Sequence, residues 1–130
     1  MTVRFTLLLP SILLLACGES NGPGPTPADP GYVELTLHAP DGETGALRIS
    51  VTGPGIDSVM TPGLLSFSSR VADHRLSALV LGDMEPGVIG RVWMPDRHLL
   101  ADYRVLVEEA VTRTYAQRAP ALYAITLQRE

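Results

Sequence analysis

The chain has 130 residues, a formal net charge of −4 and one cysteine, and all ten of its basic residues are arginine. An acidic chain without a basic cluster offers no surface for nucleic acid, and one cysteine cannot form an intramolecular disulfide. Stability must therefore come from a hydrophobic core, which a domain of about 100 residues is large enough to build.

Residues 1–16 have the profile of an export signal. Arg4 is the one charged residue of this segment, and the apolar run that follows it ends at Ala16 and is interrupted by only three residues. The run is about a dozen residues long and polar residues follow at once, whereas a helix that spans a bilayer needs roughly 20 apolar residues. We expect a signal peptide over residues 1–16, helical and detached from the domain.

The segment Leu14-Leu15-Ala16-Cys17 contains the only cysteine of the chain. It resembles the lipobox of bacterial lipoproteins, in which aliphatic and small residues precede an invariant cysteine. The resemblance implies that diacylglycerol is attached to the sulfur of Cys17, that the signal is cut before this residue, and that the new amino terminus is acylated. Several acyl chains anchor a protein durably because each buried methylene contributes about 0.8 kcal/mol.

The same resemblance implies a place in the cell envelope. Gly18 follows the cysteine and is not the aspartate associated with retention at the inner membrane, which favours the outer membrane, with the domain facing the periplasm or the cell surface. Cleavage removes Arg4 and no acid, leaving 9 arginines against 14 acidic residues and a formal charge of −5. Anionic headgroups would not attract such a body, so the lipid has to provide the attachment.

Residues 17–30 consist of the lipidated cysteine and a segment rich in proline, glycine and acidic residues. This segment has almost nothing to bury, and we expect a disordered tether. At about 3.3 Å per residue it could hold a domain some 40 Å from the lipid.

The domain is expected to begin at Gly31 and to reach Glu130, and its first two segments are clear strands. Apolar and polar residues alternate strictly from Val33 to His38 and again from Leu47 to Thr52. This period of two is typical of half-buried strands. The residues between the two segments, and Gly53-Pro54-Gly55 after the second, supply turn chemistry.

The middle of the chain predicts four further strands. Residues 57–61 are expected to form a short edge strand, and residues 64–68 another with Leu65 and Phe67 on one face. In residues 74–81 the inward positions are Leu76, Ala78 and Val80, and the apolar end of this segment suits a central strand covered on both sides. Residues 88–94 form the next strand.

Residues 98–111 fit two periods. Four apolar residues recur at helical spacing, yet Tyr103, Val105 and Val107 also alternate with their neighbours as in a strand. We favour a short helical turn over residues 97–101 and a strand from Tyr103 to about Val111, because β-branched residues suit a pleated strand better than a helix. The final strand, residues 122–128, is predicted to bury alternate residues, namely Tyr123, Ile125 and Leu127.

Seven or eight short strands separated by Pro-Gly turns predict an all-β fold, a two-sheet antiparallel β-sandwich. Their order is similar to that of immunoglobulin-like and cohesin-like sandwiches, a fold-level resemblance that implies no function. As a whole, the chain resembles small uncharacterised lipoproteins of GC-rich Gram-negative bacteria, in which a lipobox and a tether precede one β domain.

Two groups of residues combine carboxylates with imidazoles. Asp96-Arg97-His98 lies near Asp102, and Asp73 precedes His74. Neither group has a second histidine or a cysteine at zinc-ligand spacing, and such residues at turns are usually solvated or capping, so we expect no metal site. The turn that contains Asp41, Glu43 and Thr44 lacks the dense oxygen ligands of calcium loops and predicts an Asx turn.

Catalytic patterns are also missing from the sequence. Ser66, Ser68 and Ser69 lie in no nucleophile elbow, and Glu108 and Glu109 are adjacent, so in a regular strand they would face opposite sides. The aromatic residues could stack on a sugar or be buried, and both interpretations stay open. These residues are Trp93, Tyr103, Tyr115 and Tyr123.

We therefore expect a lipid-anchored cell-envelope protein whose sandwich is a non-catalytic binding or structural module. Its expected partners are the membrane, through the lipid on Cys17, and an envelope protein or glycan. No cofactor, catalytic residue or metal ligand is predicted. The alternative hypothesis is a metal-assisted or hydrolytic envelope enzyme with a site near His74 and His98.

Overall fold

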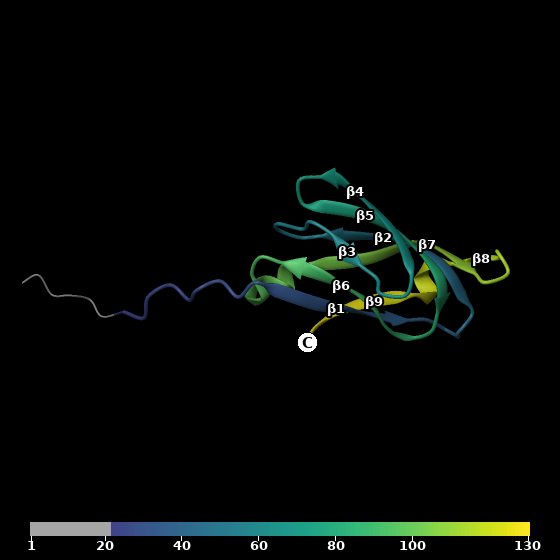
Figure 1. The fold of residues 1–130 in the computed structure, drawn as a ribbon, viewed down its shortest axis with the longest axis horizontal. Helices are drawn as coiled ribbons and strands as arrows, with labels where there is room; N and C mark the ends of the chain where they lie inside the picture. Colours follow the sequence, from purple (N-terminus) through teal and green to yellow (C-terminus); the bar gives the residue numbers. More distant parts are fainter. Residues whose placement is uncertain (1–21) are drawn as a thin grey trace, which may run out of the picture.

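The computed structural model describes residues 22–130 and has two antiparallel sheets packed face to face, as expected for a β-sandwich (Figure 1). The predicted signal helix and the lipidation of Cys17 lie outside the described residues. One sheet has four strands, in the order β3 (Val59–Met60), β6 (Gly87–Met94), β1 (Gly31–His38) and β9 (Ala124–Arg129). The other has five, in the order β4 (Leu65–Ala72), β5 (Arg75–Met84), β2 (Thr44–Thr52), β7 (Arg104–Thr112) and β8 (Gln117–Arg118). Two short 3₁₀ helices, η1 (Arg97–Asp102) and η2 (Pro120–Leu122), precede β7 and β9.

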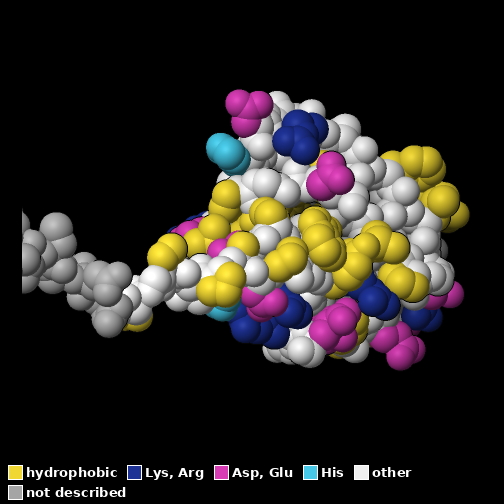
Figure 2. Space-filling view, turned by 60° about the vertical axis from the view of Figure 1, so that its left-hand side comes forward, with side chains coloured by type: hydrophobic (Ala, Val, Ile, Leu, Met, Phe, Trp, Pro, Cys, Tyr) yellow, Lys and Arg dark blue, Asp and Glu magenta, His cyan; other side chains and the backbone are white. Residues whose placement is uncertain are grey.

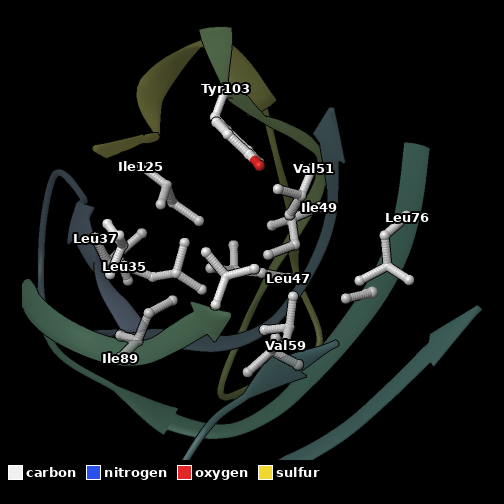
Figure 3. Close-up of a cluster of buried hydrophobic side chains, with 14 of the residues drawn as sticks. Leu35, Leu37, Leu47, Ile49, Val51, Val59, Leu76, Ile89, Tyr103 and Ile125 are labelled. Carbon is white, nitrogen blue, oxygen red and sulfur yellow. The ribbon is translucent and has the colours of Figure 1, made fainter. Parts of the chain in front are cut away.

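The core lies between the sheets, where the alternating apolar residues of the sequence meet (Figure 3). From β2, Leu47, Ile49 and Val51 are fully buried, and from β1, Leu35 and Leu37 are at most 1% exposed. Because successive side chains of a strand point to opposite faces, the same alternation turns the polar residues outward. The prediction of an all-β sandwich is confirmed.

The ambiguous segment resolves as predicted, into a short helical element followed by a strand. η1 ends at Asp102, and β7 pairs with β2 along its length. Val105 and Val107 point inward and are partly buried, whereas Leu106 is 64% exposed. The β-branched residues therefore lie on the core side of a pleat, an arrangement that a helix could not have provided.

The predicted burial on both faces of residues 74–81 is wrong. β5 is central within its sheet, between β4 and β2, and Leu76, Ala78 and Val80 do point into the core. The outward residue Leu79 is nevertheless 39% exposed, because no second layer from the part of the chain that the structure describes covers the outer face of this sheet.

The neighbouring edge strand β4 is exposed in the same way. Leu65 and Phe67 share a face as predicted, and register places each of them opposite an outward residue of β5. Their exposed fractions are 57% and 58%. A hydrophobic band on the surface is visible in Figure 2, between groups of arginine and acidic side chains.

The last strand begins later than predicted. η2 occupies residues 120–122, where Pro120 fits the start of a helical turn, and β9 begins at Ala124. Tyr123 and Ile125 are buried, as the alternation predicts, and Leu127 is partly buried. Among the helices of residues 22–130, none has the length and apolar character needed to span a bilayer.

Candidate functional site

The two sheets each end in a free strand edge on the same side of the sandwich. Among residues 22–130, β9 pairs with no strand other than β1, and β7 pairs with the short β8 only at Ala110 and Val111. The first half of β7, residues 104–109, therefore has backbone donors and acceptors on its outer side without a strand partner. A groove of about 700 Å³ lies between this half of β7, β9 and η1.

The floor of this groove is apolar. Partly buried side chains of the core reach it from three elements: Leu100 from η1, Val105 from β7, and Leu127 from β9. Ile125 lies beside them and is 7% exposed, and Leu106 projects beyond the edge of β7. The groove is thus an open flank of the hydrophobic core.

The rim of the groove is cationic. Arg97, Arg104 and Arg129 all line it, together with His98, and none of its lining residues is acidic. This is a local excess, because residues 22–130 hold 9 arginines and 13 acidic residues. A third of the arginines of an acidic domain therefore meet at one groove.

Asp29 is bonded to Arg97 and Asp96 at one end of this rim, and we call this set of hydrogen bonds the clasp. Its carboxylate accepts hydrogen bonds from Arg97 Nε at 3.1 Å and Nη2 at 2.7 Å, and its carbonyl accepts one from the Arg97 amide at 2.8 Å. Its own amide donates to Asp96 Oδ1 at 3.1 Å. Asp29 was predicted to lie within the tether of residues 17–30, but these bonds attach it to the domain.

The clasp shifts three pKa values. The hydrogen bonds from Arg97 lower the pKa of Asp29, and the same pairing raises the pKa of the guanidinium. The backbone amides of Asp29 and His98 lower the pKa of Asp96. Each of the three shifts favours the charged form of its group.

Tyr103 is one of the residues that line the groove. Its ring packs on Gly53, and its hydroxyl donates to the carbonyl oxygen of Pro54. Burial, and then the charges of Asp96 and Asp102, raise the pKa of this phenol. The side chain is 6% exposed, so it supports the groove and offers no stacking surface.

The other aromatic residues do not form a single platform. Tyr123 is buried, Trp93 on β6 packs edge to face against Tyr32 with ring centroids 5.1 Å apart, and Tyr115 is 90% exposed at the turn after β7. Trp93 lies in the four-stranded sheet, whereas Tyr115 lies in the turn that joins β7 and β8 of the other sheet.

The structure brings together one of the two predicted carboxylate–imidazole groups. Asp96 is the N-cap of η1 and accepts from the His98 amide at 3.0 Å, and its Oδ1 lies 2.9 Å from His98 Nδ1. This is the capping arrangement that the sequence suggested. His74 lies in the turn between β4 and β5, and within residues 22–130 no three His, Cys, Asp or Glu side chains gather closely enough to hold a metal ion.

The remaining candidate residues from the sequence lie in a turn and in two strands. Asp41 Oδ1 accepts from the Glu43 amide at 3.0 Å, which is an Asx turn, and Thr44 is buried at the start of β2. The three serine candidates lie along the edge strand β4, namely Ser66, Ser68 and Ser69.

The expectation that Glu108 and Glu109 face opposite sides is wrong. A β-bulge lies between β2 and β7, because Arg48 pairs with Glu109 whereas the next residue of β2 pairs with Val107. The extra residue brings both carboxylates to Arg48, at 3.5 Å from Glu108 and 2.7 Å from Glu109. Both are occupied by ion pairs, since Glu108 also binds Arg75 at 2.6 Å.

The groove itself was not found from the sequence. Its arginines are separated by 7 and 25 positions along the chain, and no spacing rule connects them. Two signals existed, the position of Arg104 at the start of a strand and the clean alternation of the last strand. Neither says which strands form the edges of the two sheets.

Comparisons with protein-family models, with curated proteins and with solved structures gave no match. The resemblances to bacterial lipoproteins and to cohesin-like sandwiches stay predictions.

Proposed function

We propose that this chain is a lipid-anchored cell-envelope protein whose sandwich is a non-catalytic binding module that engages an envelope protein or glycan. The observation that carries the binding role is the open groove between β7 and β9, which combines free strand edges, an apolar floor and an arginine rim. Grooves of this kind are common docking places for extended chains.

The anchor is supported by the order of segments along the chain. Leu14-Leu15-Ala16-Cys17 would attach the lipid, and residues 22–28 are exposed along their whole length before the clasp at Asp29. At about 3.3 Å per residue the segment from Gly18 to the clasp spans up to roughly 36 Å. Such a distance clears the headgroups and leaves the groove accessible.

The alternative, a metal-assisted or hydrolytic enzyme near His74 and His98, has no observation in its favour. The carboxylate beside His98 is that of Asp96, which already caps η1. The neighbouring cation, Arg97, forms an ion pair with Asp29. A preorganised catalytic site would need groups aimed at a common reacting atom.

The anchor is tested by metabolic labelling with tritiated palmitate. The wild-type chain should incorporate label and fractionate with membranes, whereas Cys17→Ser should remain an unlabelled precursor that still carries residues 1–16. Gly18→Asp is the matched control, because it should be labelled like the wild type and move from the outer to the inner membrane. Label in the Cys17→Ser chain would refute the anchor.

The binding role is tested by a pull-down from envelope extract, with the mature protein as bait. The non-catalytic proposal predicts that partners are retained equally with and without EDTA. Loss of binding in EDTA, or stoichiometric zinc in the purified protein, would instead favour the enzyme.

A further inference from the structure

We infer that the groove between β7 and β9 binds an extended acidic segment of a partner protein, which adds as a strand to the open edge of β7. The inference rests on the proposed binding function and goes further by naming the site and the chemistry of its occupant. Three features of the groove define that occupant: its backbone, its floor and its charge.

The backbone of β7 along the groove can pair with an added strand. Residues 104–109 pair with β2 on one side, and on the other side the described residues, 22–130, place no strand, since β8 reaches only Ala110 and Val111. An incoming extended chain would satisfy these donors and acceptors, which is how peptides add to exposed sheet edges. On the other wall, β9 likewise has no strand on its outer side within the described part of the chain.

The apolar floor favours an occupant with an apolar side chain at every second position. A strand on β7 directs every second side chain toward the core, where the groove presents Leu100, Val105 and Leu127. Small β-branched residues suit such positions, because they pack well on a pleated surface. The intervening side chains point away from the floor, to the rim and the solvent.

The rim selects acidic residues at those intervening positions. Within residues 22–130, eight of the nine arginines have an ion pair, and the one without is Arg104, at the start of the free edge. Arg129, on the other wall, reaches Asp29 only at 3.8 Å. These two guanidiniums can therefore receive carboxylates without losing a close partner, and arginine binds carboxylates in a bidentate geometry.

The chain itself is a poor occupant. Its tether contains Pro23, Pro25 and Pro27, which lack the amide hydrogens that strand addition requires. A second copy that docked groove to groove would present the same lining, which holds three arginines and no acidic residue, and like charges at an interface cost several kcal/mol. An acidic segment of a different protein avoids both problems.

The test uses a phage-displayed library of random nine-residue peptides, with the mature protein purified from membranes in detergent as bait. We expect enrichment of sequences in which β-branched residues alternate with Asp or Glu. Arg104→Glu should weaken binding of the selected peptide at least about tenfold. Arg91→Glu, the same charge change on β6 outside the groove, should leave the affinity within about twofold.

Two further measurements make the outcome decisive. N-methylation of alternate peptide amides should abolish binding, and the bound peptide should protect amides of residues 104–109 from hydrogen exchange. Overturning results would be enrichment of neutral or basic peptides, no enrichment above the Arg104→Glu bait, or equal binding of the N-methylated peptide.

Binding of polygalacturonate in place of peptides would overturn the inference in favour of an anionic glycan. If the peptide tests fail while the EDTA-resistant pull-down succeeds, the proposed binding function stands and only the peptide site is refuted. If the peptide tests and the pull-down both fail, the peptide site and the proposed binding function are both refuted.

Discussion

Gly53→Ala should destabilise the domain strongly, although it adds only a methyl group. Gly53 follows β2 at the position where the ring of Tyr103 packs against the backbone. A Cβ at this position would lie 2.2 Å from Tyr103 Cδ1 and 2.6 Å from Cε1, whereas ordinary van der Waals contact begins at 3.4 Å. The ring would have to move by the difference, about 1.2 Å, within a buried site.

The cost has two parts. Crowding a packed core costs about 1–3 kcal/mol, and the shifted ring would weaken the bond from its hydroxyl to Pro54, worth about 0.5–1.5 kcal/mol. We expect a loss of about 3 kcal/mol in the free energy of unfolding. For a domain of this size each kcal/mol corresponds to about 4–8 °C, so the Tm should fall by about 12–24 °C.

Urea unfolding followed by circular dichroism measures this loss. Gly42→Ala is the control, because the nearest atom to its Cβ is Glu85 Cγ at 3.7 Å, and its stability should stay within about 0.5 kcal/mol of the wild type. In a Tyr103→Ala background, Gly53→Ala should cost less than about 1 kcal/mol. An equal cost in both backgrounds would refute the steric explanation.

Three further predictions concern charge and the core. The lowered pKa of Asp29, ordinarily 3.8, gives stability that is present above pH 4 and lost as the pH falls through the lower folded value; Asp29→Asn should flatten this acid limb of the pH–stability curve. The triple change His38→Ala, His74→Ala, His98→Ala should leave the fold and the envelope pull-down nearly unchanged, and lost binding at an unchanged Tm would contradict this. Val51→Asp should abolish cooperative unfolding of residues 22–130, because this fully buried side chain has no partner for a charge; a sharp thermal transition would disprove it.

The strands were predictable because their signal is local. In β1 and in residues 47–52 of β2 the residues that face the core are apolar and their neighbours are mostly polar, so periodicity alone identifies the core face at Leu35 or Ile49. The same reasoning placed Val105 and Val107 on a strand. Where the alternation is clean, the pleat and the hydrophobic effect require the same arrangement.

The errors arose where the outcome depends on the partner strand. The apolar end of β5 cannot reveal whether a second layer covers Leu79, and adjacent Glu108 and Glu109 cannot reveal a bulge in their pairing with β2. The groove could not be predicted for the same reason, because its existence depends on which strands lie at the edges of the two sheets. Arg104 and Arg129 become neighbours through the topology of two sheets, a long-range property that no local pattern contains.

Photo-crosslinking in living cells tests the binding role of the groove most directly. Benzoylphenylalanine is placed at Leu106, which lines the groove and is 64% exposed, or at Leu65 on β4, which is 57% exposed and lies outside it. We predict a discrete crosslinked protein from position 106 that disappears in an Arg104→Glu background, and none from position 65. Equal crosslinking at both positions, or a product from position 65 alone, would contradict a binding site between β7 and β9.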